Sequence, residues 1–203
     1  MHQGNSVATH GAYPDSEETY KHLIAVLCRS VPRICKRSCH FMIWFSMEHI
    51  QWTLDYFDQN SDIVLNPFPL IWVKSDKGLL PDPQHGPRRM YETCFFGSLG
   101  KRPIANSVWN YFMCPTDHKD HMSTKPEPML RHFFRMFVDE NTYMLDPTCG
   151  SGTALRAAEA HKAAYVLGVE INEEFAKRAD LRLWEARRKR SEESVLEKFV
   201  GTL

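Results

Sequence analysis

The feature that most constrains this chain is an apolar segment that leads into a glycine-rich loop near residue 150. Tyr143 to Asp146 has the composition of a short buried strand, and the loop PTCGSGT follows at 147–153. An alanine-rich helix and a second apolar strand at 166–169 come next, with Glu170 at the tip of that strand. This succession of strand, glycine loop, helix and acid-tipped strand is a recurring nucleoside-binding unit of α/β sheets.

Each part of the unit has a physical role. The glycines let the backbone approach a ligand closely, and the helix N-terminus offers unpaired N–H groups. Glu170 follows Asp146 by 24 residues, close to the spacing at which an acid accepts both ribose hydroxyls. An NAD-type oxidoreductase uses the same unit, but the loop lacks the third glycine of G-x-G-x-x-G, which disfavours that alternative.

The position of the unit in the chain constrains the fold. A doubly wound sheet needs several further strands, yet only 33 residues follow Glu170 and most of them have a helical pattern. The remaining strands must therefore precede Asp146. The fold class predicted is α/β, a circularly permuted Rossmann-like fold whose nucleotide-binding half comes last.

Earlier segments supply the elements that this fold needs. Apolar spacing and capping residues predict helices at 17–30, 48–57, 129–137 and 173–189, and strands at 40–46, 63–65, 70–73 and 91–97. The stretches 75–90 and 101–125 are rich in Pro, Gly and His and are expected to be irregular.

Composition excludes some classes of protein. The chain has 203 residues, a formal net charge of zero and a pI of about 7.1, so we expect one domain over 1–203 and only local contacts with any nucleic acid. The longest apolar run, 41–45, is too short to cross a bilayer, and no secretory signal is visible, so a cytoplasmic location is expected. Six cysteines at spacings unlike those of zinc sites predict no metal.

Five segments carry a family resemblance. The loop DPTCGSGT at 146–153 resembles the S-adenosylmethionine loop (DPxxGSGT) of DNA amino-methyltransferases of the adenine-N6 / cytosine-N4 type. The segment HMSTKP at 121–126 resembles the H-x-x-x-K-P segment that precedes it in this family. Segments 41–46, 71–74 and 88–92 resemble strands of the target-base half. The order matches the permuted subgroup, common in bacteria and phages, in which the catalytic half comes first.

The resemblance implies a site-specific DNA methyltransferase that transfers a methyl group from S-adenosylmethionine to an exocyclic amine of adenine (N6) or cytosine (N4). It divides the domain into a target-base half (17–74), irregular DNA-recognition loops (75–120) and a cofactor-binding half (121–190). The residues that it assigns to cofactor binding are Asp146, Thr148, Gly150, Ser151, Gly152, Thr153, Glu170, Asn172, His121, Ser123, Lys125 and Pro126. Cys149 has no base beside it in the sequence and is expected to be a small loop residue, not a nucleophile.

The implied partner is double-stranded DNA, with no membrane; a cognate restriction enzyme and a complementing chain are further candidates. A local excess of positive charge in the middle of the chain is the candidate DNA-facing surface, because phosphate contacts need local charge. Its members are Lys74, Lys77, Arg88, Arg89, Lys101 and Arg102.

One departure from the family pattern concerns catalysis. These enzymes flip the target base and hold its amine with a (D/N/S)-P-P-(Y/F/W) loop, and no such tetrapeptide is present in this sequence. The nearest candidate is Asn66-Pro67-Phe68, which Pro69 follows, so the last two residues stand in the reverse of the order in N-P-P-F. We therefore expect the fold to lack its first strand and catalytic loop, and two readings stay open: a truncated enzyme, or an inactive cofactor- or DNA-binding remnant that needs a partner chain.

Overall fold

The computed structural model describes residues 16–35, 37–78, 80, 82–100, 102–117 and 124–200, and for 193–200 the backbone only. The first half of the fold is built around one sheet. Its strands are β1 (Cys39–Phe45), β2 (Ile63–Leu65), β3 (Leu70–Lys74), β4 (Tyr91–Leu99) and β5 (Tyr111–Cys114).

The long strand β4 organises this sheet. It pairs antiparallel with β1 along one edge, while β2 and β3 share its other edge. β3 then pairs in parallel with β5, which gives the order β1-β4-β3-β5. β5 lies in the stretch that we expected to be irregular, so that expectation was wrong for Tyr111–Cys114.

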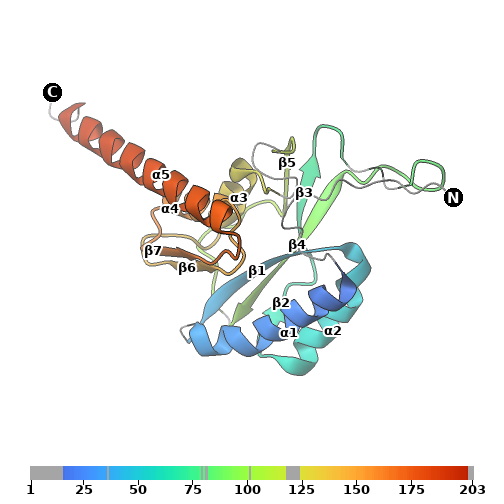
Figure 1. Cartoon of the computed structure of the whole chain (residues 1–203). Helices are drawn as coiled ribbons and strands as arrows, with labels where there is room; N and C mark the ends of the chain where they lie inside the picture. Colours follow the sequence, from blue (N-terminus) through green and yellow to red (C-terminus); the bar gives the residue numbers. More distant parts are fainter. Residues whose placement is uncertain are drawn as a thin grey trace.

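Two helices cover one face of this sheet: α1 (Glu17–Ile34) and α2 (Ile50–Asn60), the latter entered through a 3-10 turn at Met47–His49 (Figure 1). Ser16 caps α1, because its side chain accepts a hydrogen bond from the Thr19 N–H at 3.2 Å. The buried residues of this layer come from both helices and from β2. They are Ile24, Cys28, Val31, Phe57 and Ile63.

The other face packs against α3 (Glu127–Phe134), whose Phe133 is fully buried. β1 alternates between the two layers: Phe41 packs with the α1–α2 core, and Met42 packs with the α3 core. α3 also contacts α4 (Thr153–Ala160), so a single core joins the first half to the second.

The second half is the predicted nucleoside-binding unit. β6 (Tyr143–Asp146) pairs in parallel with β7 (Tyr165–Gly168), with α4 between them in sequence and α5 (Glu173–Val200) after them. Within the described residues β6 and β7 form a separate two-stranded sheet. α5 runs outward from the body, as Figure 1 shows. No helix in the described part of the chain is long and apolar enough to cross a membrane.

Candidate cofactor site

The loop after β6 is held against the chain that follows β7. The Val169 N–H donates to the Asp146 carbonyl at 2.9 Å, and the Cys149 N–H donates to the Val169 carbonyl at 3.0 Å. Gly150 and Gly152 both adopt left-handed backbone conformations, with φ of +52° and +79°. Only residues without a Cβ adopt such angles readily. The two glycines therefore let the chain turn from β6 into α4 within a few residues.

The two glycines face different surroundings. A Cβ at Gly150 would meet no atom within 4 Å, whereas a Cβ at Gly152 would lie 2.9 Å from the Cβ of Ala179 in α5. A Cβ at Gly168 would lie 2.6 Å from the Sγ of Cys149. Gly152 and Gly168 thus permit close packing, while Gly150 faces open space beside the loop.

Glu170, which follows β7, is hydrogen-bonded to this loop. Its Oε2 accepts a hydrogen bond from the Gly150 N–H at 2.9 Å, and its Oε1 accepts one from the Asn172 N–H at 2.8 Å. A carboxylate oxygen has capacity for further hydrogen bonds, so ribose hydroxyls can still be accepted here. The side chain of Asn172 caps α5 by accepting from the N–H groups of Glu174 and Phe175 at 3.0 and 3.1 Å. The structure therefore brings Gly150, Glu170 and Asn172 together.

Asp146 adds a second carboxyl group to the site. Its Oδ1 accepts a hydrogen bond from the Thr148 N–H at 3.1 Å. Burial raises the pKa of Asp146 above its ordinary value, and the charge of Glu170 raises it further, against the lowering effect of the Thr148 hydrogen bond. Two neighbouring carboxyl groups create a negative potential that favours a ligand with donor groups or positive charge.

Cys149 lies near both acids and is a poor nucleophile. Its burial, with the nearby charges of Asp146 and Glu170, raises the pKa of its thiol to about 11. The thiol is therefore protonated at neutral pH. This supports the interpretation of Cys149 as a small loop residue.

Ser151 and Thr153 are buried, at 8% and 7% exposure. Arg156 donates from Nη1 to the Ser151 carbonyl at 3.0 Å and from Nη2 to the Thr153 hydroxyl at 3.4 Å. These contacts fix the C-terminal side of the loop. Thr148 is exposed at its other end.

Lys125 and Pro126 lie at the start of α3. Pro126 is buried, and the Nζ of Lys125 lies 2.7 Å from the Oε2 of Glu92 in β4. His121 and Ser123, which the resemblance also assigns to the cofactor site, lie outside the described residues.

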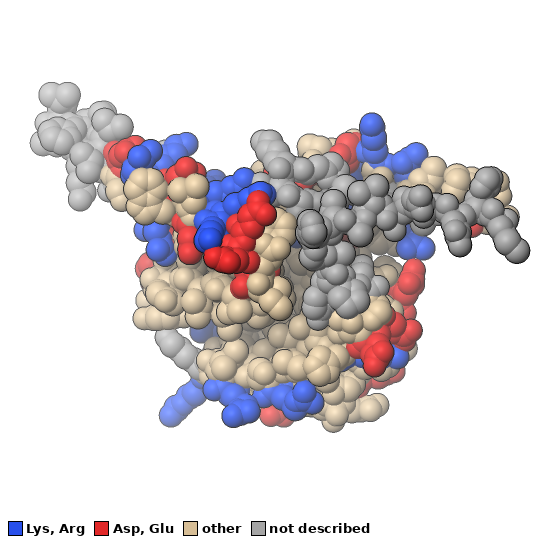
Figure 2. All heavy atoms as spheres, in the orientation of Figure 1, with Lys and Arg blue, Asp and Glu red and all other residues tan. Residues whose placement is uncertain are grey.

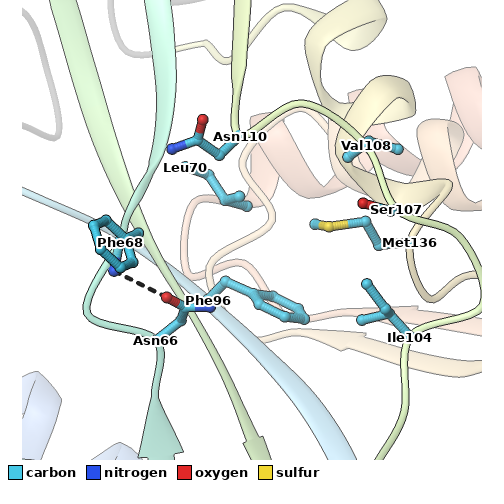
Figure 3. A pocket seen from close by; sticks show the side chains of 9 residues that line it. All are labelled: Asn66, Phe68, Leu70, Phe96, Ile104, Ser107, Val108, Asn110 and Met136. Carbon is cyan, nitrogen blue, oxygen red and sulfur yellow. Dashed lines mark hydrogen bonds between the residues drawn. The ribbon is translucent and has the colours of Figure 1, made fainter.

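Asn66, Pro67 and Phe68 form the break between β2 and β3. The Oδ1 of Asn66 accepts a hydrogen bond from the Phe68 N–H at 2.9 Å, so the amide serves the turn itself (Figure 3). The turn borders a hollow of about 440 Å³ that none of the assigned cofactor residues lines. Its lining is Asn66, Phe68, Leu70, Phe96, Ile104, Ser107, Val108, Asn110 and Met136.

The candidate DNA-facing residues have varied surroundings. Lys74 is largely buried, with 13% of its side chain exposed, and its Nζ lies 2.7 Å from Glu92. Arg88 donates to the Lys77 carbonyl at 2.6 Å, and Arg89 pairs with Glu48 at 3.3 Å. The Arg102 carbonyl is hydrogen-bonded to the His40 ring at 3.1 Å, and Lys101 lies outside the described residues. In the view of Figure 2, basic and acidic atoms stand side by side on the visible face.

Three residues at the site were not predicted from the sequence: Glu92, Glu127 and Arg156. The sequence does carry a local feature at Glu92, an acid at the start of a predicted strand, shortly after the basic pair 88–89. Its partners are 18 and 33 residues away in sequence, so only the fold shows the pairing.

Within the described ranges, no group of three His, Cys, Asp or Glu side chains is arranged to hold a metal ion. That the protein needs no metal stays a prediction.

Solved structures of other proteins share this fold. The structure of the M1.HpyAVI–SAM complex is similar with a TM-score of 0.69 and 19% identity, over 81% of this chain and 83% of that one. The PvuII DNA methyltransferase, which is cytosine-N4-specific, is similar with a TM-score of 0.67 and 14% identity, over 89% of this chain and 76% of that one. A search of curated protein sequences found no significant match. The model of a DNA methylase family, N6_N4_Mtase, matches residues 11–180. This chain therefore belongs to the N6_N4_Mtase family of DNA methylases.

Proposed function

We propose that this chain binds S-adenosylmethionine on the Gly150 loop and serves methyl transfer to an exocyclic amine of adenine or cytosine in DNA. The observation that carries the proposal is the hydrogen bond between the Gly150 N–H and the Glu170 carboxylate, at 2.9 Å. It supports the proposal because the Glu170 carboxylate, an acceptor suited to ribose hydroxyls, lies beside the open side of the loop.

The residues present fit this cofactor. The space beside Gly150 admits a ligand against the backbone, and the acids at 146 and 170 favour hydroxyl and amino donors. When bound, S-adenosylmethionine supplies an activated methyl group. The chain's contribution is to bind and orient, because the leaving group needs no further activation.

The amine-holding tetrapeptide comes, we propose, from a segment outside residues 1–203, in the same protein or on a complementing chain. The state of the sheets supports this. Among the described residues β1 pairs only with β4, and β6 pairs only with β7, so both sheets end in a strand with room for another.

An apolar face on the second sheet gives further support. Tyr143, Leu145, Tyr165 and Leu167 alternate along β6 and β7 and are 42–65% exposed. Figure 2 shows an uncharged area over these strands. Parallel sheets are normally buried on both faces. Among the described residues, no element covers this apolar face of the sheet, which supports a missing part of the covering layer.

Two experiments test the proposal. Isothermal titration of the pure chain should show binding of S-adenosylmethionine and none of NAD; the opposite selectivity would refute the cofactor assignment. Methyl transfer to DNA should be absent for the pure chain and should appear when a strand and D-P-P-Y-type loop are added. Transfer by the pure chain would refute the need for a further segment.

A non-catalytic cofactor- or DNA-binding protein is the second candidate, and the missing tetrapeptide favours it. Cofactor binding without methyl transfer, even after the segment is added, would select it. Double-stranded DNA is the substrate that family membership implies. We further propose one domain over 1–203, a cytoplasmic location, and a restriction enzyme as a candidate functional partner.

A further inference from the structure

A partly buried ion-pair cluster joins β3, β4 and the residue just before the N-cap of α3. The carboxylate of Glu92 lies between two ammonium groups, with 2.7 Å from Oε1 to Lys74 and 2.7 Å from Oε2 to Lys125. The side chains of the two lysines are only 13% and 22% exposed. Lys74 also lies over the Trp72 ring and Lys125 over the Trp44 ring, at 5.1 and 5.2 Å from the ring centroids. Such partly buried pairs hold their geometry more firmly than pairs on the surface.

A second polar cluster begins two residues after Lys125. The Oε2 of Glu127 lies 3.2 Å from the Nε of Arg156 in α4, and the side chain of Arg156 is 17% exposed. Arg156 is the residue that holds the Ser151 carbonyl and the Thr153 hydroxyl. The N-terminus of α3 thus stands between the target-base half and the glycine loop, and it is tied to each by an ion pair.

We propose that Glu92 is a positioning residue for the cofactor loop, acting through Lys125, the start of α3, Glu127 and Arg156. Glu92 holds the N-terminus of α3 in place through Lys125. Glu127, at the start of α3, in turn holds the Arg156 side chain where it can donate to the Ser151 carbonyl. The inference rests on the proposed function, because the role of Glu92 is to hold the target-base half and the cofactor half in a fixed relative position. Its structural part can be tested without cofactor.

The test compares Glu92→Gln with the matched control Glu48→Gln, which removes the charge from an exposed pair with Arg89 outside this cluster. The first measurement is the alkylation rate of Cys149 in the cofactor-free protein, followed by mass spectrometry. Cys28, buried in the α1–α2 core, reports on global unfolding. E92Q should accelerate the alkylation of Cys149 by about fivefold and leave the alkylation rate of Cys28 unchanged. A fivefold change corresponds to roughly one kcal/mol in the free energy of local opening. E48Q should change neither.

The second measurement is the affinity for S-adenosylmethionine in a double-mutant cycle of Glu92→Gln and Arg156→Lys. Residues that act through one network give a loss in the double variant smaller than the product of the single losses. Lys125→Arg, which keeps the charge, should retain the wild-type Cys149 rate, whereas Lys125→Met should behave like E92Q.

The outcomes separate the two proposals. Equal Cys149 rates in E92Q and wild type, or equal acceleration of Cys149 and Cys28, would overturn the positioning role. A wild-type chain that binds no S-adenosylmethionine would overturn the proposed function, and the Cys149 rates would still decide the role of Glu92. If E92Q does not fold, Glu92→Asp, which keeps the charge but shortens its reach, carries the same comparison.

Discussion

Gly152 lies directly against Ala179 of α5, close enough that a Cβ at position 152 would stand 2.9 Å from the Cβ of Ala179. The two residues join the cofactor loop to the helix that closes the fold. Since Gly152 also has a φ of +79°, both backbone conformation and space require glycine there.

Gly152→Ala should therefore lower the free energy of unfolding more than Gly150→Ala. Both substitutions incur the left-handed cost, about 1–2 kcal/mol, and only Gly152→Ala adds overpacking, about 1–3 kcal/mol. Urea unfolding of the two variants checks this. Equal losses would show that α5 moves aside to accommodate the methyl group.

Gly150→Ala should act on ligand binding. The methyl group would enter the open space beside the loop, where no protein atom lies within 4 Å. We expect affinity for S-adenosylmethionine to fall at least tenfold, about 1.4 kcal/mol. Titration calorimetry measures it, with Gly86→Ala as the control because a Cβ there would meet only one carbonyl oxygen, at 3.6 Å. Unchanged affinity would place the ligand elsewhere.

Glu159→Ala should loosen α5 from α4. The Glu159 side chain is 6% exposed; its Oε1 lies 2.6 Å from Arg187, and Arg190 lies 2.9 Å from its Oε2. Removing the carboxylate takes this ion-pair partner away from both half-exposed arginines. We expect a loss of about 1–3 kcal/mol in unfolding free energy. Glu192→Ala, which removes an exposed partner 3.7 Å from Arg188, should cost less than about 0.5 kcal/mol. Equal effects in thermal melts would contradict the prediction.

The stability that Glu92 contributes should depend on pH. Burial acts to raise its pKa, but the charges and hydrogen bonds of Lys125 and Lys74 outweigh burial and hold the pKa below its ordinary 4.5. The folded state therefore binds the proton less readily than the unfolded state. The contribution is fully present above pH 4.5 and is lost as the pH falls below that value. The difference in unfolding free energy between wild type and E92Q should shrink on acidification. A difference that grows on acidification would show that folding raises the pKa of Glu92, which contradicts the prediction.

Asn66→Ala should change stability and leave cofactor binding intact. Its side chain accepts the Phe68 N–H at 2.9 Å, and loss of one exposed hydrogen bond costs about 0.5–1.5 kcal/mol. In a protein that methylates DNA, with any further segment supplied, methyl transfer by the folded variant should match wild type. Selective loss of transfer would restore Asn66 as a catalytic residue.

The strand–glycine loop–helix–strand unit could be predicted from sequence because its requirements are local, while the binding of the cofactor by this loop stays a prediction. Gly150, Gly152 and Glu170 lie within one short strand–loop–helix–strand unit, and each follows from backbone geometry or helix-end chemistry. The chain order could be predicted too, since five strands in the described part of the chain come before the strand that ends at Asp146.

What the sequence did not show depends on contacts between distant segments. β5 is a short edge strand whose residues alternate between exposed and half-buried, and it is recognisable only by its pairing with β3. The pairing of Glu92 with lysines on two other elements leaves no local pattern either. That the strands of the described residues form two separate sheets likewise follows from pairing alone.

The most direct test of the account is the affinity of wild type and Glu170→Ala for S-adenosylmethionine, by titration calorimetry. Wild type should bind one molecule per chain. Glu170→Ala should bind roughly tenfold to a hundredfold more weakly, because a charge-assisted hydrogen bond contributes about 1.5–3 kcal/mol, while Glu173→Gln, an exposed control paired with Lys177, should match wild type. No binding by wild type, or equal binding by wild type and Glu170→Ala, would contradict the assignment of this loop as the cofactor site.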